Sequence, residues 1–210
     1  MYQTLYNDKS VYDKKYKVIL VGSNNVGKTS IINRYFCSEF LYEYNSTIGV
    51  DFVAKVINYN GGKYKLHIWD TGSFLDYQKI LQSYFIEGDL FLFVFDLNRL
   101  TTIYDLDKWI TQVKEYRKDK ETIGILIGNK SDIINKNIDQ TMINTLSNKF
   151  GFPYIEISCK NGENIENIFD IGFTLLENKC TDKNSIVVEN NTYSFFQNKR
   201  KNNNCNCNII

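Results

Sequence analysis

The sequence has no uninterrupted apolar run that is long enough to cross a membrane. Its longest plain run is LFLFVF at residues 90–95, which is far shorter than the roughly 20 residues of a membrane-spanning helix and is typical of a buried strand. The amino-terminal MYQTLYNDKS also lacks the basic-then-apolar layout of a secretory signal peptide. We therefore expect the chain to work in the cytoplasm.

The sequence also has little net charge, an odd number of cysteines and a single histidine. The formal net charge is +1, which argues against an electrostatic grip on nucleic acid, so we expect no nucleic-acid partner. The five cysteines are odd in number and scattered, which excludes a disulfide framework. The single histidine, His67, falls in an alternating strand pattern, and we interpret it as a strand residue rather than a metal ligand or acid–base group.

What the sequence does contain is an alternation of apolar strands with helical segments. Strands are expected at residues 16–21, 51–59, 63–69, 90–96, 123–128 and 154–157, and helices at 28–37, 102–117, 139–150 and 163–178. Asn60-Gly61-Gly62 is a strong hairpin signal between the second and third strands. With a further helix before residue 90, this order predicts an α/β fold: a six-stranded, mostly parallel sheet with one antiparallel edge pair and helices on both faces.

Length and composition divide the chain into three parts. A chain of 210 residues fits one domain plus an appendage. We expect an N-terminal extension at residues 1–13, a globular domain at 14–178 and a flexible tail at 179–210. Residues 181–210 contain nine asparagines and no helical or strand period, which is typical of a flexible segment.

One motif predicts a phosphate site, at the edge of the sheet where ligands of such folds bind. Residues 22–29 read GSNNVGKT and match G-x-x-x-x-G-K-S/T between an expected strand and an expected helix, so the fold is predicted to be that of a P-loop NTPase. Curled backbone N–H groups and the helix N-terminus face the phosphates, Lys28 reaches the β- and γ-phosphates, and Thr29 ligates Mg²⁺. Asparagine, as at Asn25, tolerates the left-handed angles of such a loop. The expected binding residues here are Gly22, Ser23, Asn24, Asn25, Val26, Gly27, Lys28, Thr29 and Ser30.

A second motif distinguishes guanine from adenine. Residues 129–132 read NKSD and follow an expected strand. The Asp132 carboxylate can accept hydrogen bonds from the guanine N1–H and 2-amino groups, whereas adenine would leave it buried and unpaired. Asn129 is expected to hold the base edge and the neighbouring loop, and the Lys130 stem to cover the ring. Ser158-Cys159-Lys160, after the last strand, supplies a backbone N–H for the guanine carbonyl. The set predicts GTP and GDP as ligands and disfavours a nucleotide kinase or an ATPase.

With these motifs in place, the chain resembles small GTPases of the Rab family over roughly residues 14–178. Residues 47–52 read TIGVDF, as is typical of Rabs, and residues 65–71 read KLHIWDT, close to the family's KLQIWDT. The resemblance implies a monomeric switch that hydrolyses GTP and regulates vesicle traffic. It also implies that Thr47 ligates Mg²⁺ and senses the γ-phosphate, that Asp70 holds Mg²⁺ through a water, and that Phe40 stacks edge-on against the guanine. Catalytic roles then fall to Lys28 and Thr47.

The resemblance also implies a set of protein partners. These are effectors at residues 38–77, an exchange factor, a TBC-type GTPase-activating protein, a GDP dissociation inhibitor and a Rab escort protein. The polar loop at residues 38–50 is expected to order when a γ-phosphate is there to contact. Phe52 and Trp69 are expected on adjacent strands with Tyr84 or Phe85 nearby. They form either a surface read by effectors or ordinary core packing.

One stretch departs from the family pattern. Where Rabs read DTAGQERF, residues 70–77 read DTGSFLDY. Ser73 replaces the glycine whose N–H meets the γ-phosphate; serine keeps the N–H but has less backbone freedom. Phe74 replaces the glutamine that orients the attacking water, so slow intrinsic hydrolysis is expected. Three alternatives stay open: a TBC-type activator that supplies arginine and glutamine in trans, a GTP-binding scaffold without turnover, and remodelling that places the Gly72 N–H at the γ-phosphate.

The carboxyl terminus has the outline of a lipid anchor. A basic run, NKRK at residues 198–201, precedes Cys205 and Cys207. Residues 207–210 (CNII) follow the C-a-a-X outline with a polar first "a", while the cysteine pair is similar to the C-x-C ending of many Rabs, which receive two geranylgeranyl groups. Which cysteine is modified stays open. Two lipid chains, or one with a basic patch, give stable anchoring, so we expect the chain at the cytoplasmic face of an intracellular membrane.

Overall fold

The structure is a computed structural model that describes residues 11–42, 47, 49–72, 78–118, 120–134 and 137–180. At residues 78–81 and 180 it describes the backbone alone. The predictions for Ser73, Phe74, Cys205 and Cys207 lie outside the described residues, as do those for residues 1–10 and 181–210.

Six strands form one sheet in the order β2-β3-β1-β4-β5-β6. Their bounds are β1 Lys14–Val21, β2 Val50–Tyr59, β3 Gly62–Thr71, β4 Leu90–Asp96, β5 Gly124–Asn129 and β6 Tyr154–Glu156. The edge pair β2–β3 is antiparallel and the other neighbouring pairs are parallel. The expected hairpin turns at Asn60 (φ 46°) and Gly61 (φ 84°), two left-handed residues of the kind that match the twist of a hairpin. The predicted fold class is confirmed.

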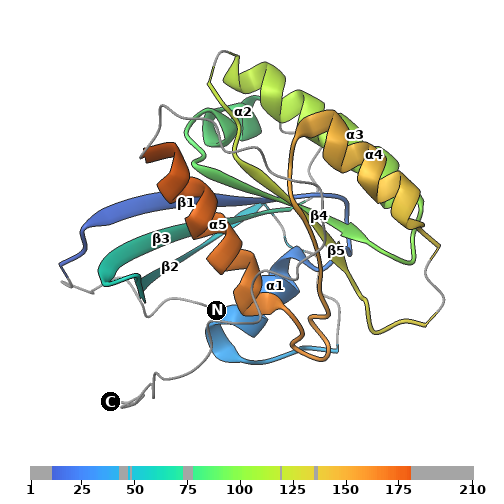
Figure 1. Cartoon of the computed structure of the whole chain (residues 1–210), viewed down its shortest axis with the longest axis horizontal. Helices are drawn as coiled ribbons and strands as arrows, with labels where there is room; N and C mark the ends of the chain where they lie inside the picture. The colour runs from blue at the N-terminus through green and yellow to red at the C-terminus, as the bar shows by residue number, and fades with distance from the viewer. Residues whose placement is uncertain are drawn as a thin grey trace. The chain divides into compact units, whose positions relative to one another are not determined.

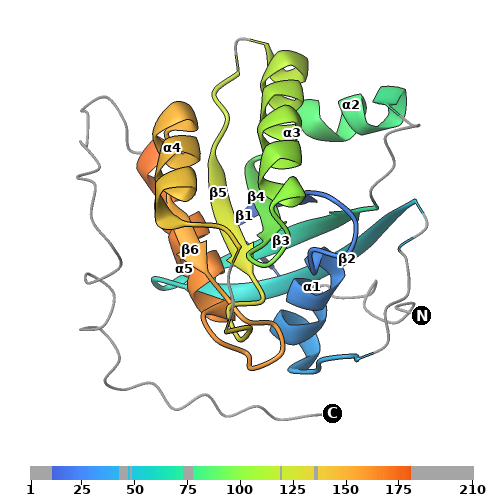
Figure 2. The same cartoon turned by 90° about the vertical axis from the view of Figure 1, so that its right-hand side faces the viewer.

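Helices cover both faces of this sheet (Figure 1). Their bounds are α1 Lys28–Cys37, α2 Gln78–Ile86, α3 Thr101–Arg117, α4 Gln140–Phe150 and α5 Ile165–Cys180. Because side chains alternate along a strand, Val18 of β1 belongs to the core cluster that includes residues of α1 and α5, and Ile19 belongs to the cluster that includes residues of α2, α3 and α4. Figure 2 shows these helices around the sheet in a second view. None of the described helices is both long and apolar enough to span a bilayer.

The central strand β4 is buried along its whole length, as expected from its apolar run. Phe91, Phe93 and Phe95 face the core beneath α2–α4, and Leu90, Leu92 and Val94 face the other core. Each fully buried apolar side chain contributes about 1.5–3 kcal/mol relative to exposure. This packing gives a rigid support to the residues that follow the carboxyl end of β4.

Two helices begin later than the apolar pattern predicts, and each has a local cause. Asp139 is the N-cap of α4, since its carboxylate accepts a hydrogen bond from the Met142 N–H at 2.9 Å, so the helix begins at Gln140. Before α5, Glu163 forms an isolated β-bridge with Ser158, and Asn164 is left-handed at φ 59°. The predicted start of the last helix at residue 163 was therefore two residues early.

Candidate nucleotide-binding site

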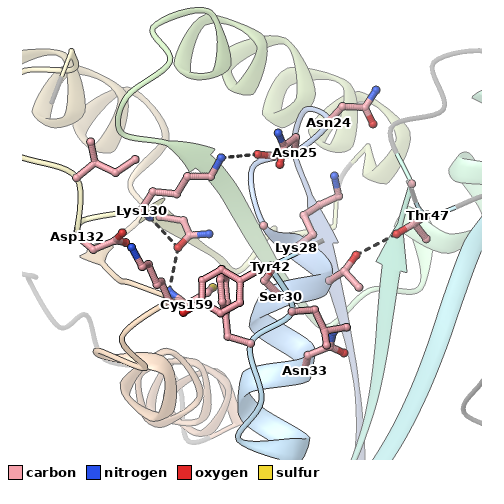
Figure 3. Close-up of a pocket in the computed structure, with 18 residues that line it drawn as sticks. Asn24, Asn25, Lys28, Ser30, Asn33, Tyr42, Thr47, Lys130, Asp132 and Cys159 are labelled. Atoms are coloured by element: carbon pink, nitrogen blue, oxygen red, sulfur yellow. Dashed lines mark hydrogen bonds between the residues drawn. The ribbon is translucent and has the colours of Figure 1, made fainter. Parts of the chain in front are cut away.

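The loops at the carboxyl ends of β1, β3, β5 and β6 border one cleft of about 430 Å³ (Figure 3). The predicted site residues that line it are Asn24, Asn25, Gly27, Lys28, Thr29, Ser30, Phe40, Thr47, Asn129, Lys130, Asp132, Cys159 and Lys160. Four further lining residues were not predicted from the sequence: Asn33, Leu41, Tyr42 and Ile133. Gly72 also lines the cleft, and it was predicted only in an alternative role. Gly22, Val26, Asp70 and Ser158 are buried and support its wall. Asp132 and Cys159 lie at one end, and Lys28 and Thr47 at the other (Figure 3).

The loop after β1 depends on glycine at two positions. Gly22 (φ 151°) is so close to the Val94 backbone that a Cβ would collide with the Val94 carbonyl oxygen. Gly27 (φ 100°) meets the side-chain amide of Asn129 in the same way. Asn25 is left-handed at φ 58°, the conformation that asparagine tolerates better than most residues. Helix α1 then begins at Lys28 with no side-chain cap among the described residues, which leaves its first N–H groups to an anion.

Side-chain donors hold all five carbonyls of residues 22–26. Lys28 Nζ donates to the first two, at 2.8 and 3.0 Å, and Arg99 donates to the third. Lys130 Nζ donates to the fourth at 2.9 Å, and Asn129 Nδ2 to the fifth at 2.8 Å. A carbonyl that accepts such a bond is polarised, which strengthens the N–H on the other side of its peptide as a donor. The loop is thus arranged to present backbone N–H groups to an anion.

Two of these donors are cations whose own environment is unusual. Lys28 is only 7% exposed, and burial lowers its pKa to about 8, while Asp70 raises this pKa and Arg99 lowers it. The Lys130 ammonium pairs with Asp96 at 2.7 Å, so its stem is fixed along the wall of the cleft. Arg99 was missed by the sequence analysis. Its position could have indicated this role, because Arg99 follows the buried strand at residues 90–96 and so lies at the edge of the sheet where the other motifs meet.

Asn129 connects the phosphate end of the cleft to the opposite end. Its side chain is buried, and its Oδ1 accepts hydrogen bonds from the Lys130 N–H at 2.7 Å and the Cys159 N–H at 3.3 Å. Its Nδ2 donates to Val26, as described above. One amide therefore holds three loops.

The predicted guanine-reading carboxylate is oriented by a serine. Asp132 Oδ1 accepts a hydrogen bond from Ser158 Oγ at 2.7 Å, and Ser158 Oγ accepts one from the Asn161 N–H at 3.1 Å. Cys159 follows on the wall of the cleft, where burial raises the pKa of its thiol to about 12. The thiol is therefore neutral at physiological pH and acts as an apolar part of the wall.

An arginine that the sequence analysis did not single out fixes the same loop. Arg34 of α1 donates from Nε to the Cys159 carbonyl at 2.8 Å and from Nη2 to the Lys160 carbonyl at 2.6 Å. A third bond, from Nη1, reaches the Ser38 carbonyl at 2.8 Å. The guanidinium carbon lies 5.9 Å from the centroid of the Phe40 ring. Arg34 thereby positions both the loop after β6 and the aromatic ring expected to stack on a base.

The residues predicted to hold Mg²⁺ come together in the structure. The hydroxyls of Thr29 and Thr47 lie 2.9 Å apart, and both hydrogen-bond Oδ2 of Asp70. Asp70 is 1% exposed, its Oδ1 has no hydrogen-bond partner among the described residues, and burial raises its pKa. A buried carboxylate with a free oxygen beside two hydroxyls suits a hard cation with oxygen ligands, such as Mg²⁺. Thr29 and Thr47 would hold the ion, with Asp70 acting through water, and the ion would neutralise polyphosphate charge.

The aromatic residues discussed for effector binding are clustered. Phe52 and Trp69 pair in register on β2 and β3 with ring centroids 4.6 Å apart, and the Trp69 and Tyr84 rings are 4.8 Å apart. All three are half-buried, whereas Phe85 is fully buried in the core beneath α2. Of the two residues proposed, Tyr84 is therefore the one that completes the cluster.

A strand, a glycine-dependent phosphate loop and a helix with an open N-terminus define a P-loop nucleotide-binding α/β protein. The profile of the Ras family matches residues 17–178 of the chain. The chain therefore belongs to the Ras family, whose members bind GTP and GDP, typically with Mg²⁺.

The relatives that the chain matches carry Rab-type names. It is 32% identical over 181 residues to Ras-related protein SEC4 of Saccharomyces cerevisiae, which covers 86% of this chain and 83% of that protein. It is 32% identical over 159 residues to human Ras-related protein Rab-30, covering 75% and 78%. Bovine Ras-related protein Rab-26 is 30% identical over 176 residues, covering 83% and 67%. The family predicted from residues 47–52 and 65–71 is confirmed.

We expect the affinity of the chain for GDP to fall as pH rises through about 8. Free Lys28 loses its proton there, whereas a polyphosphate beside it would stabilise the protonated form, so binding above this pH must take up a proton. The resulting slope is at most about tenfold per pH unit. Titration with fluorescent GDP over a pH series measures it. Lys28→Ala is the control: it should bind GDP weakly, and without the lysine it should lack the proton uptake and the pH dependence that this residue causes. Equal slopes in the two proteins would contradict the prediction.

Proposed function

We propose that the chain is a GTP- and GDP-binding switch that regulates vesicle traffic at intracellular membranes, with slow intrinsic hydrolysis of GTP. The main support for the proposal is that side chains donate hydrogen bonds to five consecutive carbonyls of the phosphate loop. Two of these donors, Asn129 and Lys130, belong to the NKSD motif. Phosphate recognition and base recognition are thereby built into one unit.

The contacts of the ligand follow from this arrangement. The polyphosphate binds the N–H groups of the loop at residues 22–29 and the Lys28 ammonium, with Ser30 at the start of α1 nearby. Guanine donates to Asp132, accepts from a backbone N–H of residues 158–160 and stacks against Phe40. These assignments rest on the cleft lining and on the donor and acceptor pattern of guanine.

The switch itself is assigned to Thr47. Its hydroxyl lies 2.9 Å from that of Thr29, so a bound Mg²⁺ and γ-phosphate would fix the loop that carries it. Loss of the γ-phosphate would release the loop, which is the order–disorder type of switch. By family resemblance, effectors, an exchange factor, a TBC-type activating protein, a GDP dissociation inhibitor and a Rab escort protein act on the two states. Lipidation of Cys205, Cys207 or both would hold the chain at the cytoplasmic face of its membrane.

Replacing Phe74 by glutamine tests the switch and its chemistry together. Full-length protein loaded with radiolabelled GTP should retain it in Mg²⁺. In single-turnover assays Phe74→Gln should hydrolyse GTP about tenfold faster than wild type or more, because an amide can position the attacking water and a phenyl ring cannot. Phe74→Leu is the matched control, since it removes the ring without adding a hydrogen-bonding group, and its rate should stay at the wild-type level.

The outcomes separate the candidate functions. Equal rates for wild type and Phe74→Gln would show that Phe74 does not limit hydrolysis. Retention of GTP without turnover, even with a TBC-type activating protein, would favour the second candidate function, a GTP-binding scaffold. This candidate is suggested by the presence of Phe74 where Rabs have the glutamine that orients the attacking water. Failure to retain either guanine nucleotide in Mg²⁺ would overturn both.

A further inference from the structure

The guanidinium of Arg34 joins two segments that border the cleft. It donates hydrogen bonds to the Cys159 carbonyl at 2.8 Å and the Lys160 carbonyl at 2.6 Å. It also donates to the Ser38 carbonyl at 2.8 Å, and its carbon lies 5.9 Å from the Phe40 ring centroid. Cys159, Lys160 and Phe40 line the cleft, so Arg34 can act on a bound base through them.

The hydrogen bond to the Cys159 carbonyl fixes the direction of the next N–H group. The carbonyl and the N–H of one trans peptide point in opposite directions, so the Lys160 N–H points away from Arg34. Among the residues that the structure describes, no acceptor takes this N–H. The N–H groups of residues 159 and 161 differ, because they donate to side-chain oxygens at 3.3 and 3.1 Å. Of these three donors, the Lys160 N–H is the one available to a ligand.

The positive charge of Arg34 also strengthens this donor. A hydrogen bond from a guanidinium is charge-assisted and about twice as strong as a neutral one. A carbonyl that accepts such a bond is polarised, which makes the N–H on the other side of its peptide a better donor. Guanine has a carbonyl oxygen at position 6 that can accept from such a group, whereas adenine has an amino group there.

The ends of the same loop are closed without Arg34. The Ser158 N–H donates to the Glu163 carbonyl at 3.2 Å, and the Gly162 and Glu163 N–H groups donate to the Ser158 carbonyl at 2.8 and 3.0 Å. These bonds do not involve the peptide between Cys159 and Lys160. Loss of the guanidinium would therefore free that peptide to turn while the ends of the loop stay closed.

We propose that Arg34 is a positioning residue that sets the specificity of the site for a carbonyl oxygen at position 6 of the purine. It presents the Lys160 N–H to that oxygen, and its bond to Ser38 holds the segment whose Phe40 ring stacks on the same base. The inference rests on the proposed binding of guanine nucleotides and assigns one part of base recognition to Arg34. Asp132 reads a different part of the base, the N1–H and the 2-amino group, so the two contributions can be measured separately.

Nucleotides that differ from GDP at one position of the base separate these contributions. In 6-thio-GDP sulfur, a weak acceptor, replaces the position-6 oxygen, while IDP lacks the 2-amino group. Competition against fluorescent GDP gives the GDP/6-thio-GDP and GDP/IDP affinity ratios of the full-length protein. We expect wild type to prefer GDP over 6-thio-GDP about fivefold or more. In Arg34→Ala this ratio should approach 1, while the GDP/IDP ratio should stay within about twofold of wild type.

Arg99→Ala is the matched control, because it removes an arginine that donates to a loop carbonyl at the phosphate end of the cleft. It should weaken the binding of all three nucleotides by a similar factor and leave both ratios at their wild-type values. Arg34→Lys keeps the charge but lacks the planar fork that serves several carbonyls. Its GDP/6-thio-GDP ratio should lie between those of Arg34→Ala and wild type.

Three results would overturn the proposal. The first is a GDP/6-thio-GDP ratio near 1 in wild type, and the second is retention of the wild-type ratio in Arg34→Ala. The third is an equal fall of both ratios in Arg34→Ala, which would indicate general loosening of the site. If urea denaturation shows that Arg34→Ala is unfolded, Arg34→Lys decides, and a wild-type ratio in that variant overturns the proposal. If wild type binds none of the three nucleotides, the proposed function fails, whereas GDP binding with an unchanged ratio overturns only the role of Arg34.

Discussion

Asp132→Asn should lower the affinity for GTP and GDP by about 10²- to 10⁴-fold and transfer preference to xanthosine nucleotides. Two hydrogen bonds from guanine to a carboxylate contribute about 1.5–3 kcal/mol each, and an amide in the same place presents one acceptor and one donor. The Ser158 hydroxyl, 2.7 Å from Asp132 Oδ1, would keep binding an oxygen and so turn the new NH₂ toward the base. Xanthine has a carbonyl where guanine has its amino group, and this carbonyl accepts from that NH₂.

Competition of fluorescent GDP by unlabelled GDP, XDP and ADP measures both effects. Ser158→Ala is a useful comparison, because it removes the hydroxyl that orients the carboxylate while leaving the carboxylate itself. We expect it to weaken GDP binding less than Asp132→Asn and to give no preference for XDP. If Asp132→Asn retained its preference for GDP, another residue would be reading the base.

Asn129→Ala should disable the site and destabilise the fold at once. The side chain makes three hydrogen bonds, to Val26, Lys130 and Cys159, while it is only 2% exposed. Removing it leaves buried backbone groups without partners, at about 1–3 kcal/mol for each group that water does not reach. We expect the free energy of unfolding to fall by about 2–4 kcal/mol and nucleotide affinity to fall by about 10²-fold or more.

Urea denaturation without nucleotide and GDP competition measure the two effects separately. Asn129→Asp provides a sharper comparison, since it keeps the acceptor for two N–H groups but places a carboxylate oxygen against the Val26 carbonyl. It should bind nucleotide no better than Asn129→Ala. The exposed Asn161 serves as a control, because Asn161→Ala should change stability by less than about 0.5 kcal/mol. A stable, nucleotide-binding Asn129→Ala protein would contradict the view that one amide joins the loops.

The fold could be predicted closely because its signals are local and periodic. The run at residues 90–96, the glycine-rich loop before α1 and the Asn60-Gly61 turn each specify their own conformation. Their order then leaves few topologies. The start of α5 was predicted less accurately. Glu163 forms a β-bridge with Ser158, and this contact cannot be foreseen from the apolar pattern of the helix.

The candidate site was predictable to the extent that its residues belong to contiguous motifs. Arg34 and Arg99 were missed because their roles depend on long side chains that cross between elements. Arg34 reaches Cys159, 125 positions away in the sequence, and Arg99 reaches Asn24, 75 positions away. No spacing rule relates such pairs. The choice between Tyr84 and Phe85 likewise depended on how α2 is rotated on the sheet, which neighbouring aromatic residues do not determine.

The single amide of Asn129 has a consequence for how a ligand leaves the cleft. Because it fastens the phosphate loop at Val26 and the purine-side loop at Cys159, a displacement of Asn129 by either loop strains the bond that holds the other. We therefore expect the two loops to loosen together when a ligand leaves, which would slow its departure. A regulator that displaced either loop would then also loosen the other, so a contact on one side of the cleft would weaken the hold on both ends of the ligand.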